Sequence, residues 1–90
     1  MMETVHLVIK GKVQGVYYRA SARDIAIELG IKGWIKNVPG GQVEVMASGN
    51  KEELEKFIGW CRRGPKNAEV SDIIVTTREE QDFSDFTIKR

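Results

Sequence analysis

Hydrophobic and polar residues alternate near the start of the chain, over residues 4–13. The apolar residues that share one face of this segment are Val5, Leu7, Ile9 and Val13. The residues that fall mostly on the opposite face are Thr4, His6, Lys10 and Lys12. Because successive side chains of a strand point to opposite faces, this pattern predicts a β-strand with one buried face.

Two later segments carry apolar residues at helical spacing. The apolar positions of the first are Ala22, Ile25, Ala26 and Leu29. They predict a helix over residues 18–29, followed by Gly30 in the position where glycine commonly ends a helix. The apolar positions of the second are Leu54, Phe57, Ile58 and Cys61. Asn50 and Glu53 are typical of a capping box at the start of this helix, and Gly64-Pro65 ends it.

The remaining regular segments are short and rich in strand-forming residues. Residues 34–38 and 42–47 flank the turn Pro39-Gly40-Gly41 and predict a hairpin. Residues 70–76 are rich in β-branched side chains, and Phe86 and Ile88 indicate a short terminal strand. The order is β, α, β, β, α, β with a small extra strand. It predicts an α+β, ferredoxin-like βαββαβ sandwich with two helices on one face of a mainly antiparallel sheet, forming a single domain over residues 1–90.

Composition limits the chemistry available to this fold. The 90 residues include one histidine and one cysteine, so a zinc site, a disulfide and a paired-histidine acid and base are excluded within the chain. The net charge of +1 gives no bulk attraction to nucleic acid or membrane, and we expect neither as a partner. Residues 1–40 hold six basic and three acidic groups, so the positive excess lies in this glycine-rich half.

No apolar run resembles a membrane span or signal peptide, and the unpaired thiol suits a reducing compartment, so a cytoplasmic location is expected.

The segment from Gly11 to Arg19 leads from a predicted strand into a predicted helix. Successive backbone N–H groups can converge on one point at such a helix start, and Gly15 lets the chain curl inward. Arg19 faces the positive end of the helix dipole, which costs a few tenths to about 1 kcal/mol unless an anion compensates. This favours a phosphate site. The alternative is that Gly15 only ends the strand and Arg19 is a solvated helix residue. The segment is not a P-loop, because no Lys-Ser or Lys-Thr pair follows the glycines.

A second motif surrounds Asn37, at the end of a predicted strand. Alone, this asparagine is typical of a turn. The run Gly33-Trp34-Ile35-Lys36-Asn37, followed by Gly41, Val43 and Gly49, accompanies the Gly11–Arg19 segment. Together the two motifs resemble those of the acylphosphatase family, and the resemblance extends from Val5 to Lys89.

The resemblance implies a function and a set of site residues. Acylphosphatases hydrolyse acyl phosphates to a carboxylate and inorganic phosphate without metal or cofactor. The implied phosphate-binding loop consists of Gln14, Gly15, Val16, Tyr17, Tyr18 and Arg19. Arg19 is expected to hold the phosphoryl group and Asn37 to position the attacking water. We expect a monomer that phosphate, the product, inhibits competitively. Ile35 and Val38 depart from the residues usual in the family, and Val38 could alter a hydrogen bond around Asn37.

The implied chemistry needs few groups. Positioning and charge stabilisation carry most of phosphoryl transfer, and loop amides with one arginine supply both. The leaving carboxylate needs no general acid, because its conjugate acid has a pKa of about 4. Asn37 cannot act as a base near neutral pH, but its carbonyl can accept a hydrogen bond from water.

Several other residues and two alternative functions also bear on this interpretation. His6 is expected to pack on the sheet or lie at its surface, Cys61 and Tyr18 to pack in the core, and Tyr17 and Trp34 to pack or to line a substrate pocket. An RNA-recognition-like module shares the same element order, but its stacking aromatics belong in the middle of the sheet. The other alternative is a silent regulatory domain that only binds a small anion.

Overall fold

The computed structural model of the chain describes residues 2–89. Its strands are β1 (Met2–Lys12), β2 (Lys32–Val38), β3 (Gln42–Asn50), β4 (Glu69–Arg78) and β5 (Phe86–Ile88). Its helices are α1 (Tyr18–Glu28) and α2 (Lys51–Arg63). The element types and their order confirm the sequence prediction. Strand boundaries differ by a few residues, because backbone pairing continues beyond the hydrophobic pattern.

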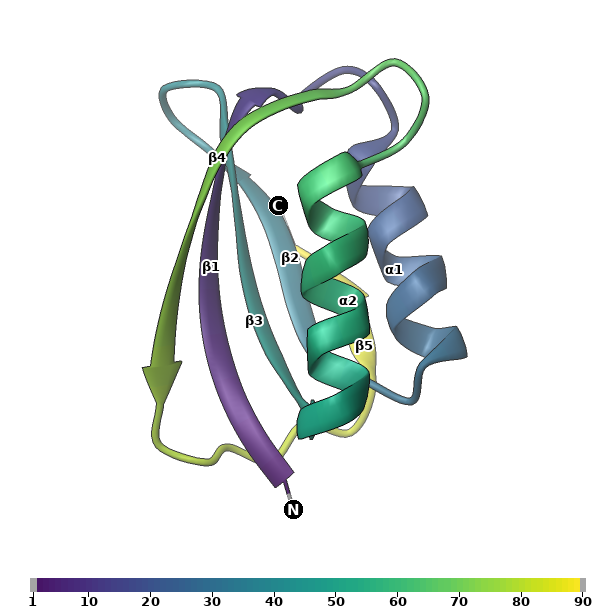
Figure 1. Cartoon of the computed structure of the whole chain (residues 1–90), viewed down its shortest axis with the longest axis vertical. Helices are drawn as coiled ribbons and strands as arrows, with labels where there is room; N and C mark the ends of the chain where they lie inside the picture. The colour runs from purple at the N-terminus through teal and green to yellow at the C-terminus, as the bar shows by residue number, and fades with distance from the viewer. Residues whose placement is uncertain (1, 90) are drawn as a thin grey trace.

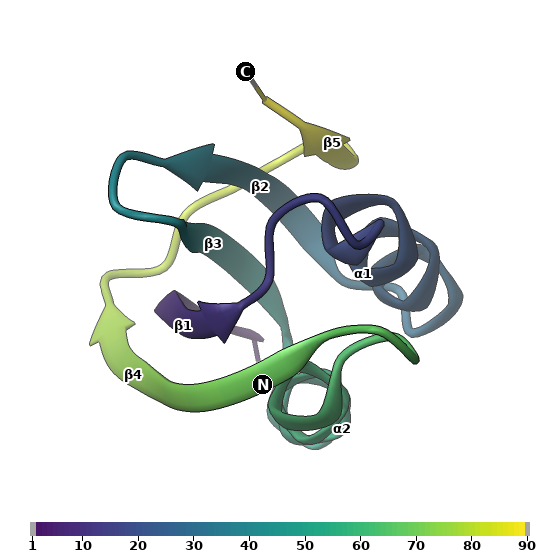
Figure 2. The same cartoon turned by 90° about the horizontal axis from the view of Figure 1, so that it is seen from above.

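The strands form one five-stranded sheet in the order β4-β1-β3-β2-β5. All neighbouring pairs are antiparallel except β2 and β5, which are parallel. Both helices lie on the same face of the sheet (Figure 1), and the view from above separates this helical layer from the twisted sheet (Figure 2). The mainly antiparallel, two-layer architecture is therefore confirmed.

The core lies between the sheet and the helices. The sheet residues that are fully enclosed in it are Leu7, Ile9, Ile35, Val43, Val45 and Ala47. The helices contribute Ala22, Ala26, Leu54, Phe57 and Cys61. Each large aliphatic or aromatic side chain buried here stabilises the fold by about 1.5–3 kcal/mol relative to an exposed one. Cys61 is 0% exposed, and burial raises the pKa of its thiol to about 12. The thiol is therefore protonated and packed, as expected.

The first strand differs from its predicted pattern at both ends. Thr4 was expected mostly on the polar face, but it is 1% exposed. Its hydroxyl forms a hydrogen bond with the Ser48 hydroxyl and accepts one from the Gln81 N–H at 2.9 Å. A polar side chain is buried there because its hydrogen-bonding groups are satisfied. At the other end, β1 stops at Lys12, and Val13 lies outside the strand although it is buried.

An irregularity in the β1–β4 pairing falls between Lys10 and Gly11. Gly11 has a φ of 122°, and a Cβ at this position would collide with the backbone oxygen of Glu69. Glycine is therefore required both for the backbone conformation and for the close approach of β4. The extra residue is Ser71 of β4, which is skipped between the pairs formed by Lys10 and Gly11.

The helix ends only partly match the prediction. Gly30 has a φ of 72° and follows the last turn of α1, as expected. Asn50 is the N-cap of α2, but its side chain makes no capping hydrogen bond, so the predicted capping box is wrong in that respect. Glu52 and Glu53 lie in the first turn and complement the helix dipole instead.

Candidate active site

The loop between β1 and α1 turns through two residues with positive φ. Gly15 has a φ of 75°, and Tyr17, the N-cap of α1, has φ 62° and ψ 24°. Glycine adopts this conformation freely, whereas a residue with a Cβ is strained in it by about 1–2 kcal/mol. No local feature of the sequence predicts the left-handed conformation of Tyr17. Strain of this kind in a short loop is typical of functional sites.

The N–H groups at the start of α1 are available to a ligand. Within residues 2–89, no protein acceptor takes a hydrogen bond from the backbone N–H groups of residues 15–19. The N-cap makes no side-chain capping bond, and the first turn carries no acidic residue. Unsatisfied N–H groups and the positive end of the helix dipole together favour an anion at this point.

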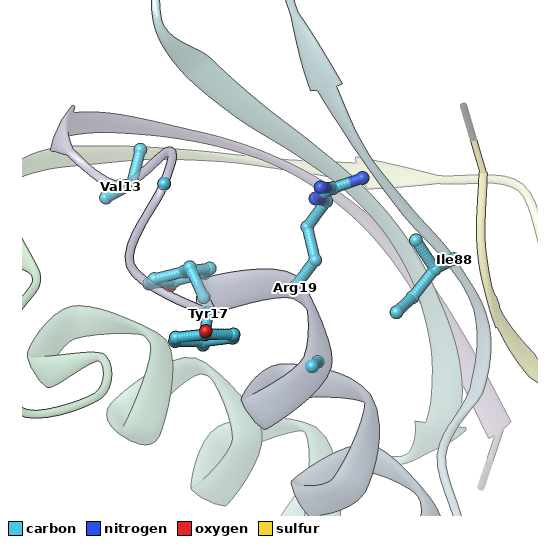
Figure 3. A pocket seen from close by; sticks show the side chains of 7 residues that line it. Val13, Tyr17, Arg19 and Ile88 are labelled. Carbon is cyan, nitrogen blue, oxygen red and sulfur yellow. The ribbon is translucent and has the colours of Figure 1, made fainter.

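Arg19 extends from the first turn of α1 into the adjacent pocket. Figure 3 shows its guanidinium group in the space between Val13 of the loop and Ile88 of β5. The pocket has a volume of about 620 Å³. The residues that line it are Val13, Gly15, Tyr17, Tyr18, Arg19, Ala20 and Ile88. Arg19 is half-buried, and no carboxylate within residues 2–89 forms an ion pair with it. The side chain is a free cation beside the free N–H groups.

Gln14 lies in the same loop but does not line this pocket. Its side-chain Nε2 donates hydrogen bonds to the backbone carbonyls of Val38, at 3.0 Å, and Gln42, at 2.7 Å. Both hydrogens of the amide group are therefore donated to the neck of the β2–β3 hairpin, which is the Val38–Gln42 pair next to the turn. The prediction that places Gln14 in the loop is consistent with this position, but its side chain is committed to the hairpin rather than to a ligand.

Asn37 lies near the end of β2, paired with Val43 of β3. Strand alternation places it on the same face as Ile35, which is the face covered by the helices. Its side-chain Oδ1 is buried, and no hydrogen-bond partner for it is found within residues 2–89. Leaving a buried acceptor unsatisfied costs about 1–3 kcal/mol, so such an atom in a folded protein requires an explanation. Asn37 does not line the pocket around Arg19.

The two tyrosines of the loop have different environments. Tyr17 is 83% exposed, whereas Tyr18 is 1% exposed. The Tyr18 ring packs against Trp60, and burial raises the pKa of its hydroxyl far above the usual value, which keeps it protonated. Tyr18 therefore packs in the core, as predicted, although one edge of it reaches the pocket. Val16 is half-buried and packs against the hydrophobic core.

Other polar groups lie on the face of the sheet that the helices do not cover. His6 is hydrogen bonded to Glu44 at 2.7 Å, and Lys36 lies 3.5 Å from the same carboxylate. The hydrogen bond from His6 and the charges of His6 and Lys36 outweigh desolvation and hold the pKa of Glu44 below its usual range. Trp34 lies nearby with the ammonium groups of Lys36 and Lys89 over its ring, at 5.3 and 4.7 Å. Trp34 therefore packs on the sheet and does not line the pocket around Arg19.

Residues 2–89 hold neither a cluster of metal-ligating side chains nor a helix that could span a membrane. No cluster of three or more His, Cys, Asp or Glu side chains in this range could hold a metal ion. Neither helix in the same range has the length and apolar character needed to cross a membrane.

Comparison with known proteins identifies the family. The sequence model of the acylphosphatase family matches residues 5–88. The acylphosphatase of Methylococcus capsulatus is 43% identical over 90 residues, which cover 99% of this chain and 98% of the relative. The chain belongs to the acylphosphatase family. Membership supports the hydrolysis of acyl phosphates as its activity.

Solved acylphosphatase structures share the fold over almost their whole length. The Coxiella burnetii acylphosphatase superimposes with a TM-score of 0.94 at 36% identity, covering 98% of this chain and 93% of that one. The Bacillus subtilis acylphosphatase gives a TM-score of 0.94 at 31% identity, with both chains fully covered. The acylphosphatase architecture, a ferredoxin-like sandwich, is therefore that of this chain.

Two properties of this candidate site are not predicted from the sequence. The left-handed conformation of Tyr17 has no signal in the sequence, because the position is not a glycine or an asparagine. The bonds from Gln14 to the hairpin join residues that are 24 and 28 positions apart. Hydrogen bonds over such separations leave no local signal in the sequence.

Proposed function

We propose that this acylphosphatase hydrolyses the carboxyl-phosphate bond of acyl phosphates with Arg19 and the N–H groups of residues 15–19 as the phosphoryl site. The observation that carries the proposal is the free Arg19 guanidinium in a pocket at an uncapped helix start. A guanidinium can donate two parallel hydrogen bonds to phosphate oxygens, and the amides add further donors without any side-chain movement. The implied loop residues are Gln14, Gly15, Val16, Tyr17, Tyr18 and Arg19.

Asn37 is proposed to position the attacking water. Its buried Oδ1 lacks a protein partner within residues 2–89, and it faces the helical side of the sheet at the end where α1 begins. This oxygen can accept a hydrogen bond from water and direct a water lone pair toward phosphorus. The water oxygen forms the new P–O bond as the bond to the carboxylate oxygen breaks. The proton of the water passes to a phosphate oxygen.

No metal or cofactor is required in this scheme. The leaving carboxylate has a conjugate acid with a pKa of about 4, so it leaves without a proton donor. The positive groups at the loop stabilise the negative charge of the phosphoryl oxygens, which is the role metal ions fill in many other phosphoryl-transfer enzymes. Every group in the scheme comes from one chain, so a monomer is sufficient.

Hydrolysis of benzoyl phosphate tests the proposal. We expect the purified protein to release benzoate and phosphate at the same rate with and without EDTA, and inorganic phosphate to inhibit competitively. A protein that binds phosphate but does not hydrolyse benzoyl phosphate would be the anion-binding module that the sequence also allowed. Loss of activity in EDTA, restored by a divalent metal, would contradict the metal-independent scheme.

A further inference from the structure

The proposed site is assembled from two segments that are distant in the sequence. Arg19 and the free amides belong to the loop before α1, whereas Asn37 belongs to β2. Catalysis by positioning requires a fixed distance between the phosphoryl group and the water, and therefore between these two segments. Within residues 2–89, the only side chain that joins the loop to the end of β2 by hydrogen bonds is Gln14.

The geometry of Gln14 suits this task. Val38 and Gln42 are register partners at the neck of the β2–β3 hairpin, and their carbonyl oxygens accept the two hydrogen bonds of Nε2. The loop is thus fixed to both strands of the hairpin by one rigid, planar group. Val38 directly follows Asn37, so the hydrogen bond to its carbonyl holds the backbone next to the water-positioning residue.

The bonds also explain why this position carries glutamine. Both acceptors are backbone carbonyls, which require donors, and the side-chain amide of glutamine supplies two N–H groups from one nitrogen. Glutamate has nearly the same shape but is acceptor-only when ionised, so it would face two carbonyl oxygens with no proton to share. Asparagine has the donors but is one methylene shorter.

We infer that Gln14 is a positioning residue for hydrolysis, which fixes the phosphate-binding loop at the correct distance from Asn37. This inference rests on the proposed function. It assigns to Gln14 no contact with the substrate, because both of its side-chain donors are used by the hairpin. Displacement of a reacting group by about 1 Å can lower a rate by about 100-fold, so loss of the two bonds should act mainly on kcat.

The first test compares Gln14→Met and Gln14→Glu with the control Gln42→Met. Gln42 lies at the same hairpin neck, and only its backbone carbonyl is used by Gln14. We expect both Gln14 variants to lower kcat for benzoyl phosphate by about 10- to 100-fold and to change the phosphate inhibition constant by less than about threefold. Gln42→Met should leave both within about twofold. Equal losses of kcat and phosphate affinity, or a kcat near that of the wild type, would overturn the inference.

The second test places Gln14→Met in an Asn37→Ala background. If Gln14 acts through Asn37, the Gln14→Met substitution should lower kcat by less than about threefold in the Asn37→Ala background, because the water is no longer positioned. If the two losses multiply, Gln14 acts independently of Asn37 and the inference is wrong. All assays are run well below the unfolding midpoint of each variant. Should Gln14→Met fail to fold, the milder Gln14→Asn carries the same comparison.

Failure of the proposed function would look different. A wild-type protein that does not hydrolyse benzoyl phosphate would overturn the proposed function, and with it the catalytic role of Gln14. An active wild type with fully active Gln14 variants would overturn only the role of Gln14.

Discussion

The Tyr18 hydroxyl donates a 2.7 Å hydrogen bond to the backbone carbonyl of Cys61. Cys61 lies in the last turn of α2, where carbonyl groups have no intrahelical partner, so Tyr18 satisfies one of them. Tyr18 also directly precedes Arg19. One buried bond therefore anchors the start of α1, which holds the proposed phosphoryl site, to the end of α2.

Replacing Tyr18 by phenylalanine tests the contribution of this bond to stability. The Tyr18→Phe variant keeps the ring but leaves the Cys61 carbonyl unsatisfied. We expect the free energy of unfolding to fall by about 1–3 kcal/mol, as measured by urea unfolding. Tyr17→Phe is the matched control, since the exposed Tyr17 forms no hydrogen bond with its hydroxyl within residues 2–89. A Tyr18→Phe variant as stable as the control would mean that the bond contributes nothing.

The left-handed conformation of Tyr17 predicts that the protein is more stable with glycine than with alanine at this position. Alanine at this position keeps the strain of a Cβ at positive φ, whereas glycine removes it. In spite of the higher entropy of glycine in the unfolded chain, we expect Tyr17→Gly to be more stable than Tyr17→Ala by about 1 kcal/mol. Thermal unfolding of the two variants measures the difference. The opposite order would show that the loop adopts a different conformation.

A buried polar cluster at the far end of the sheet should affect stability without affecting catalysis. Thr4 binds Ser48 and Gln81, and the Ser48 hydroxyl donates to the Gln81 carbonyl at 3.0 Å. We expect Thr4→Val to lower the free energy of unfolding by about 1–3 kcal/mol, because the two hydrogen bonds of the buried Thr4 hydroxyl are lost. The kcat for benzoyl phosphate should stay within about twofold of the wild type. A large fall in kcat in the folded variant would contradict the separation of this cluster from the site.

The ion pairs of Glu44 predict a dependence of stability on pH. His6 and Lys36 hold the pKa of this carboxyl below its usual value in the folded protein. A group whose pKa is lowered on folding stabilises the protein above its unfolded pKa, and this contribution is lost as the pH falls through the folded pKa. We therefore expect Glu44→Gln to destabilise the protein more at about pH 5.5 than at about pH 3. Urea unfolding of the wild type and the variant at both pH values measures the destabilisation. The same destabilisation at both pH values would contradict the prediction.

The sequence predicts the elements of this fold well, because each has a clear local pattern. The alternation from Val5 to Ile9 and the helical stripe from Leu54 to Cys61 both place apolar side chains in the core. The burial of Thr4 could not be predicted in this way, since its partners Ser48 and Gln81 are 44 and 77 residues distant. Thr4 is buried because these long-range hydrogen bonds satisfy its hydroxyl, although the local pattern predicts an exposed polar residue.

Local sequence features indicate only one of the two parts of the candidate site. The loop around Arg19 can be predicted from local features alone, because a glycine-containing turn leads into a helix whose first turn carries an arginine. The proposed role of Asn37 follows from the sequence only through the resemblance, because one asparagine before a turn is ordinary. Its buried, unpartnered Oδ1 is a property of the folded chain, as are the two bonds of Gln14.

Arg19 is proposed to bind the phosphoryl group, and Asn37 is proposed to position the water. Both roles are tested by measuring the kcat for benzoyl phosphate and the phosphate inhibition constant of Arg19→Ala and Asn37→Ala. Arg23→Ala, from the same helix, is the control. Arg19→Ala should abolish turnover and weaken phosphate inhibition together, whereas Asn37→Ala should lower kcat with little change in inhibition. Arg19→Ala with wild-type phosphate inhibition would contradict the account, as would Asn37→Ala with wild-type kcat.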